Sequence, residues 1–222
     1  MSSTNRGAER DADDKYSTPP EVSRLICRTL KADGWVESPT RLLEPGCGEG
    51  SFLDAMATVW PRATSVGVDL NDELVDIAVD RGHEAYTCNF LTVKDLGEPF
   101  DAIIGNPPFV HAEAFIKRSL SLCRPEGIVA FILRLNFLGS QERFRTLWNH
   151  PDWKSKLARV YVLPARVGFT ADGRSDSIEF AVFIFKPNHR GPVTFGFMDN
   201  LGTENRWRGE AWLWRRAKGA SE

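Results

Sequence analysis

Apolar and polar positions along the chain follow two alternating patterns. Short runs rich in β-branched and aromatic residues, such as 64–70 and 100–104, predict strands. Stretches with apolar side chains on one helical face, such as 51–60 and 71–82, predict helices. Wholly apolar runs are typical of strands buried on both sides of a parallel sheet. The alternation therefore predicts an α/β domain with a mostly parallel sheet.

The remaining elements extend this pattern toward the carboxyl end. Further strands are expected at 41–43, 84–88, 128–133, 160–163, 180–185 and 193–197, and further helices at 112–123 and 141–148. At 222 residues the chain is long enough for one domain. We expect that domain at 16–200, after a flexible tail at 1–15 and before a Trp/Arg-rich tail at 201–222.

The composition limits the class of protein. With 42% hydrophobic and 26% charged residues, the chain is typical of globular proteins. Its apolar runs, such as 128–133, are at most six residues long, far below the roughly 20 residues of a membrane-spanning helix. The first 15 residues contain no apolar stretch, and the four cysteines and four histidines lack metal-ligand spacing. We therefore expect a cytoplasmic protein without disulfides, a metal or a membrane partner.

The near-neutral net charge conceals an uneven distribution. Residues 1–116 carry ten Lys and Arg against twenty Asp and Glu, whereas 117–166 carry ten against three. A basic block of this kind suits an anionic partner such as nucleic acid. Solvated helix faces would give the same count, so charge alone leaves both interpretations open.

A glycine-rich turn, 44–50 (EPGCGEG), follows the first expected strand and opens a helix. Ligands of open α/β sheets bind at this position, where glycines let the backbone approach closely. The spacing G-x-G-x-G fits neither a dinucleotide fingerprint nor a Walker loop. Asp69 ends the second strand, where a carboxylate can accept hydrogen bonds from ribose hydroxyls. Glu44 suits a cationic group, and a ribose with a cationic amino-acid moiety describes S-adenosylmethionine.

The fourth strand ends in Asn106-Pro107-Pro108-Phe109. Consecutive prolines hold the backbone rigid at the edge of the sheet. The Asn106 side-chain oxygen and the Pro107 carbonyl could accept both N–H groups of an exocyclic amine and direct its lone pair at a methyl donor. Phe109 could stack on a planar substrate. The tetrapeptide thus predicts a methyl transfer to a planar amine or amide.

These motifs resemble those of class I S-adenosylmethionine-dependent methyltransferases. Within that class the chain is similar to compact, phage-type adenine-N6 DNA methyltransferases. The resemblance rests on EPGCGEG (44–50), VGVDL (66–70), CNFL (88–91), NPPF (106–109) and YSTPP (16–20), with later stretches at 134–148 and 166–185. It implies a Rossmann-like, mostly parallel, seven-stranded sheet flanked by helices, and S-adenosylmethionine as cofactor.

The resemblance also implies roles for individual residues. Asn89 replaces the acid that usually accepts the cofactor's adenine amino group. The implied cofactor contacts are Tyr16, Thr18, Pro19, Glu44, Gly46, Cys47, Gly48, Asp69, Leu70, Asn89 and Phe90. For the substrate, Phe169 is a second candidate for stacking, Arg134 a candidate phosphate contact, and Arg166 and Arg174 lie in the polar loop 164–177 expected to read the target.

The polymer that carries the amine stays open at this point. Adenine N6 in DNA is favoured, because the basic block suits a polyanion. A duplex target would have to be flipped out of the stack. RNA adenine or guanine is the main alternative, followed by a glutamine side chain in a protein. A non-catalytic cofactor-binding subunit is less favoured, since such a subunit has no need for an intact Asn106-Pro107-Pro108-Phe109.

Overall fold

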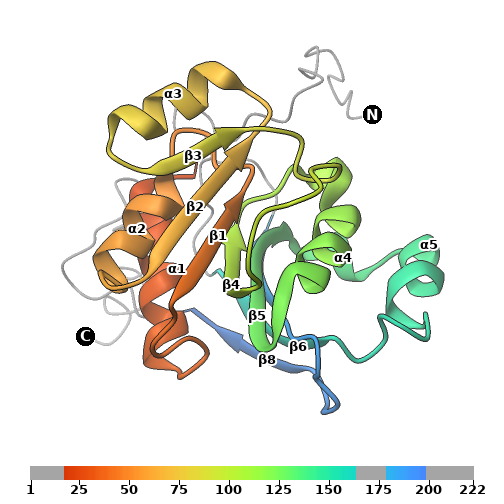
Figure 1. The fold of residues 1–222 in the computed structure, drawn as a ribbon. Coiled ribbons are helices and arrows are strands. Elements are labelled where there is room, and N and C mark those ends of the chain that lie inside the picture. The colour runs from red at the N-terminus through yellow and green to blue at the C-terminus, as the bar shows by residue number, and fades with distance from the viewer. Residues whose placement is uncertain (1–17, 164–178, 199–222) are drawn as a thin grey trace, which may run out of the picture.

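The computed structural model describes residues 18–163 and 179–198 and centres on one sheet (Figure 1). The sheet has eight strands in the order β3-β2-β1-β4-β5-β7-β6-β8. The strands are β1 (Arg41–Pro45), β2 (Thr64–Asp69), β3 (Glu84–Thr87), β4 (Phe100–Gly105), β5 (Cys123–Arg134), β6 (Leu157–Val162), β7 (Phe180–Phe185) and β8 (Thr194–Phe197). The helices are α1 (Pro20–Ala32), α2 (Ser51–Val59), α3 (Asp72–Asp80), α4 (Ala112–Leu122) and α5 (Gln141–Arg143), with the shorter turns η1 (Phe109–His111), η2 (Leu135–Leu138) and η3 (Phe144–Trp148).

The expected mostly parallel sheet is confirmed. Among the described strands, β7 runs antiparallel to its neighbours β5 and β6, and every other pair is parallel. The carboxyl ends of β1, β2, β4 and β5 therefore meet along one border of the sheet, called the carboxyl edge below. β7 begins at this edge, because Phe180 pairs with Arg134 at the end of β5.

The core fills both faces of the sheet. Helices α1 and α2 cover one face, and α4 with the segment 135–148 covers the other (Figure 1). Successive residues of β5 alternate between the two clusters: Ile128, Ala130 and Ile132 face α1 and α2, while Val129, Phe131 and Leu133 face α4. Burial on both sides explains why this strand is a continuous apolar run.

One expectation about the elements is wrong. The sheet has the eight strands that the sequence pattern indicates rather than the seven that the resemblance implies, because β8 pairs in parallel with β6 (Val160 opposite Phe195) and covers a backbone edge that would otherwise be unpaired. The helix expected at 141–148 is confirmed, as one α-helical turn followed by the π-helix η3. Leu147 and Trp148 of this segment both pack on the core.

Gly67 in β2 is required by close packing with the neighbouring helix. A Cβ at this position would lie 2.8 Å from Leu53 Cδ1 and 2.9 Å from Cys47 Sγ. Gly67→Ala should therefore lower the free energy of unfolding by about 1–3 kcal/mol, the usual cost of overpacking a core. Urea unfolding measures this. The control is Gly139→Ala, whose Cβ would approach only the Asn136 oxygen at 3.9 Å; equal stability losses in both variants would contradict the packing argument.

Candidate active site

The glycine-rich turn 46–50 is held in a conformation that favours glycine. Gly46, Gly48 and Gly50 have φ angles of 70°, 50° and 84°. In this left-handed region a side chain is strained, which is why glycine recurs at every second position. The Gly46 N–H donates to the Val68 carbonyl at 2.7 Å, which fixes the start of the turn against the end of β2.

The glycine turn and the tetrapeptide 106–109 are neighbours at the carboxyl edge. β1 pairs with β4 (Leu43 opposite Ile103), so the chain leaves both strands at the same level. A Cβ on Gly46 would lie 3.8 Å from Pro108 Cδ, an ordinary van der Waals contact. The two motifs, which are 56 positions apart at their closest, therefore line one site.

Asp69 joins this site from the end of β2. Its Oδ2 accepts a hydrogen bond from the Gly48 N–H at 2.8 Å, and its Oδ1 accepts one from the Asn71 N–H at 2.9 Å. An ionised carboxylate has about four acceptor positions, so two further donors can be accommodated. The next residue, Leu70, is 70% exposed. An oriented carboxylate, an exposed apolar side chain and a glycine-rich turn together fit a nucleoside with its ribose at Asp69.

Glu44 has a structural role that nothing in the sequence indicates. It is 3% exposed, and its carboxylate accepts hydrogen bonds from the N–H groups of Leu53 (2.9 Å) and Phe52 (3.4 Å) in the first turn of α2. Burial raises the pKa of this carboxyl well above its ordinary value. Its two N–H donors oppose that rise, while the negative charges of Asp69 and Asp54 add to it. Glu44 thus holds α2, and with it the glycine turn, against the end of β1.

The start of α1 lies beside the start of α2. Ser23 of α1 donates from its hydroxyl to the Ser51 carbonyl at 2.9 Å. Pro19 caps α1, and the Thr18 side chain before it is buried. The structure therefore brings Thr18 and Pro19 close to the helix that the glycine turn opens. Tyr16 lies outside the described residues.

The segment after β3 reaches the site beside Asp69. The Cys88 N–H donates to the Asp69 carbonyl at 2.8 Å, so Asn89 and Phe90 follow at the same edge. Asn89 Oδ1 accepts the Leu91 N–H at 2.9 Å. Phe90 is buried, with its ring 5.0 Å from that of Phe115 on α4. Phe90 thus supports the wall of the site from within the core.

The tetrapeptide has aromatic and cationic neighbours. Asn106 directly follows β4, and Pro108 precedes the short turn η1. The Phe109 ring lies 5.7 Å from the Phe180 ring, at an angle of 34°. The Arg134 guanidinium carbon lies over the Phe109 ring, 4.9 Å from its centroid. Phe180 was not expected here, since an apolar run such as 180–185 gives no sign that its first residue borders a site.

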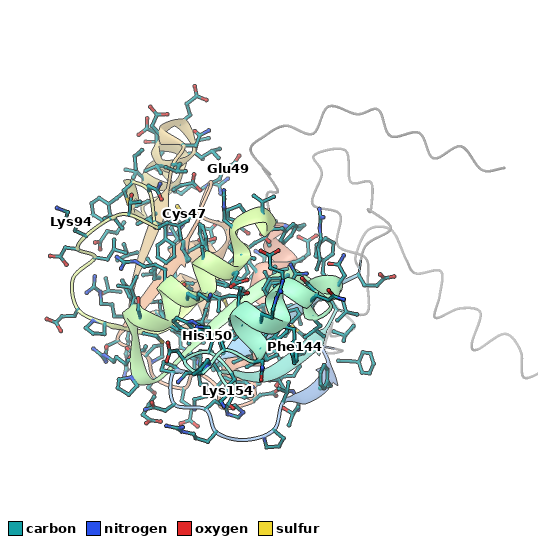
Figure 2. The ribbon with its side chains drawn as sticks, turned by 90° about the vertical axis from the view of Figure 1, so that its right-hand side faces the viewer. Cys47, Glu49, Lys94, Phe144, His150 and Lys154 are labelled. Carbon is teal, nitrogen blue, oxygen red and sulfur yellow. The ribbon has the colours of Figure 1, made fainter. Side chains whose placement is uncertain are left out.

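Several residues of the basic block are engaged in hydrogen bonds within the fold or lie away from this site. Arg143 donates from Nε to the Phe137 carbonyl at 2.8 Å, and Lys156 donates to the Pro187 carbonyl. Figure 2 shows Cys47 and Glu49 of the glycine turn well apart from His150 and Lys154. The latter two precede β6, which runs parallel to β8 and antiparallel to β7, so they lie at the edge opposite the carboxyl edge. Arg134 remains at the site.

The other candidate substrate residues, Phe169, Arg166 and Arg174, lie outside the described residues, as do both tails. Within residues 18–163 and 179–198, no group of three or more His, Cys, Asp and Glu side chains could hold a metal ion. No helix in the same part of the chain is long and apolar enough to cross a membrane.

The strand order, the antiparallel β7, the glycine turn and the acid that ends β2 define the class I fold of S-adenosylmethionine-dependent methyltransferases. The family described as "Methyltransferase domain" matches residues 17–161. The chain belongs to this family, and S-adenosylmethionine is the cofactor of the class.

Comparisons with individual proteins agree on the class and differ in the substrate. The type II methyltransferase M.CvrRI of Paramecium bursaria Chlorella virus XZ-6E is 26% identical over 152 residues, which cover 60% of this chain and 39% of that protein. The rRNA N(6)-adenosine-methyltransferase metl-5 of Caenorhabditis elegans is 26% identical over 137 residues, covering 52% and 61%. Other matches are named for small-molecule and acyl-carrier-protein substrates.

Among solved structures, the type I restriction-modification methyltransferase subunit of Streptococcus thermophilus superposes with a TM-score of 0.67. Its sequence is 19% identical, and the match covers 82% of this chain and 47% of that one. This likeness shows the fold. The matched region spans less than half the length of the first curated relatives.

The raised pKa of Glu44 predicts a distinct dependence of stability on pH. Below the ordinary pKa of 4.5 the carboxyl is protonated in both the folded and the unfolded chain. Above it, the unfolded chain releases the proton first, so the stability of the wild type should fall relative to Glu44→Gln as the pH rises toward the folded-state pKa. Urea unfolding at several pH values from 4 to 8 measures the difference. The exposed control Glu73→Gln should show no such trend, and parallel curves for wild type and Glu44→Gln would contradict the burial effect.

Proposed function

We propose that this chain transfers a methyl group from S-adenosylmethionine to the N6 amine of adenine in DNA. The observation that carries the proposal is the position of Asn106-Pro107-Pro108-Phe109 at the end of β4, with Pro108 against Gly46 of the glycine turn. The tetrapeptide that would bind the amine and the glycine turn that would bind the nucleoside thus share one site.

The tetrapeptide supplies positioning. An exocyclic aromatic amine is a poor nucleophile, since its lone pair is delocalised into the ring. The Asn106 side-chain oxygen and the Pro107 carbonyl each accept one of its N–H groups, which favours a pyramidal nitrogen. S-adenosylmethionine, when bound, supplies an electrophilic methyl on its sulfonium. As the nitrogen lone pair forms the new N–C bond, the methyl C–S bond would break with its electron pair on sulfur, which leaves as a neutral thioether. The Asn106 and Pro107 oxygens would stabilise the positive charge that develops on the amine until its proton passes to water.

The glycine turn and its neighbours form the cofactor half of the site. Asp69 would accept hydrogen bonds from the ribose hydroxyls, and the exposed Leu70 would pack on the adenine. Gly46, Gly48 and the backbone of Cys47 would hold the methionine part, with Thr18 and Pro19 at the start of α1. The Asn89 side-chain oxygen would accept a hydrogen bond from the adenine amino group, while Phe90 is buried in the core.

Two polymers are candidate substrates, DNA first and RNA second, and a different relative supports each. Similarity to a viral type II methyltransferase supports DNA. Similarity to an rRNA N(6)-adenosine-methyltransferase supports RNA as the second candidate, with the same chemistry at the same atom. Incubation with tritiated methyl donor and DNA, RNA or protein in parallel tests both. Label in protein alone, or in no polymer, would reject methylation of a nucleic acid.

Asn106→Ala should separate transfer from cofactor binding. Loss of a preorganised acceptor should lower kcat at least 100-fold, the usual effect of removing one such group. The dissociation constant for the cofactor, measured by calorimetry, should change by less than about twofold, since Asn106 faces the substrate amine. Asn149→Ala, at an exposed position, serves as the control. Transfer at the wild-type rate in Asn106→Ala would remove this side chain from the mechanism.

Asp69→Ala should instead weaken cofactor binding. Loss of charge-assisted hydrogen bonds to the ribose costs about 1.5–3 kcal/mol, which is roughly a 10- to 150-fold higher dissociation constant. Asp76→Ala removes the same charge from the exposed side of α3 and should bind as the wild type does. Thermal melting checks that both variants are folded. An unchanged dissociation constant for Asp69→Ala by calorimetry would contradict the ribose role.

A further inference from the structure

Arg134 lies where a stacked substrate would be expected. It is the last residue of β5 and pairs across the sheet with Phe180 of β7. Its guanidinium carbon is 4.9 Å from the centroid of the Phe109 ring and lies over that ring. A planar guanidinium over an aromatic face is a favourable cation–π contact. One face of Phe109 is therefore covered by a flat cation.

The second neighbour of Phe109 has little freedom to leave. Phe180 is 4% exposed and belongs to β7, which is hydrogen-bonded between β5 and β6. Moving its ring would open a cavity in the core, which is unfavourable. Arg134 is half-buried at a strand end, with a long side chain whose head can swing out. A base that stacks on the face of Phe109 under the guanidinium must therefore displace it.

The covered state leaves one hydrogen-bond donor of Arg134 unused. In the part of the chain that the structure describes, its buried Nε has no hydrogen-bond acceptor. A buried donor without an acceptor is unfavourable, because it has lost its water and gained no replacement. A phosphate oxygen would satisfy it, and guanidinium–phosphate pairs are among the stronger hydrogen bonds in proteins. The Arg134 guanidinium could therefore leave the Phe109 ring and bind a phosphate group, which would satisfy this donor.

We propose that Arg134 is a displaceable cover of Phe109 that yields its place to the target base and moves to a phosphate of the same nucleic acid. This inference rests on the proposed function, since it requires a substrate with both a planar base and a phosphate. The exchange keeps Phe109 covered in the absence of substrate. It also favours nucleotides over free bases, because the lost cation–π contact is offset by the new ion pair only where a phosphate is present.

NMR of the arginine Nε–H groups observes the exchange directly, without turnover. In the free protein the Arg134 Hε signal, assigned by its loss in Arg134→Lys, should be shifted upfield by the ring current of Phe109. Saturation with an adenine-containing oligonucleotide should remove that upfield shift. An Arg134 signal that keeps its upfield shift in the saturated complex would overturn the proposal.

The affinities for two ligands give a second test, because Arg134→Met should change them in opposite directions. Arg134→Met should bind deoxyadenosine, which has no phosphate, several-fold more tightly than the wild type, since the cover is gone. The same variant should bind an oligonucleotide more weakly, with the slope of log K against log salt reduced by about 0.9, as for one phosphate contact. Arg62→Met, an exposed arginine before β2 at the opposite edge, is the matched control. The proposal would be overturned if Arg134→Met binds deoxyadenosine no more tightly than the wild type does, or if neither protein binds it.

The two hypotheses fail in different ways. A wild-type protein that neither binds nor methylates any nucleic acid rejects the proposed function, and this inference with it. Normal methylation together with an unmoved Arg134 signal, or with lower deoxyadenosine affinity in Arg134→Met, rejects the inference alone.

Discussion

The buried carboxylate of Glu44 is the constraint on which the rest of the site depends. It lies between the end of β1 and the first turn of α2, where it accepts the Leu53 and Phe52 N–H groups. Those donors are among the four that every helix start leaves without an intrahelical partner. By satisfying them, Glu44 fixes the direction in which α2 leaves the sheet. The glycine turn between the two elements is then short and close to Pro108.

Charged side chains of the basic block also form ion pairs within the fold. Much of the basic block stabilises the fold: Arg124 pairs with Asp101 at 2.6 Å, and Lys117 pairs with Glu113 at 2.7 Å. Arg134 differs from these, since it lies at the carboxyl edge over an aromatic ring. A count of basic residues along the chain therefore overstates the surface that is open to a polyanion. Of the three basic residues compared, Arg134 is the one at the site.

Most of the fold could be predicted from local sequence patterns. The apolar runs at 102–104 and 180–185 form buried strands, because a residue that faces a core on either side must be apolar. The helix expected at 71–82 begins after Asn71, a residue type favoured at this position, whose side chain accepts the Leu74 N–H. The π-helix 144–148 and the pairing of β8 could not be predicted. Both depend on distant partners: the core that receives Leu147, and the free edge of β6.

For the site, local sequence establishes which groups are present and in what order: a glycine turn after β1, an acid at the end of β2 and Asn106-Pro107-Pro108-Phe109 after β4. These are local features, because glycine permits a left-handed turn and consecutive prolines cannot continue a strand, whatever surrounds them. Which of these groups meet is a matter of tertiary structure. It placed Pro108 against Gly46, turned Glu44 toward α2 and set Arg134 and Phe180 beside Phe109. Such contacts depend on strand order and register, which no short stretch of sequence contains.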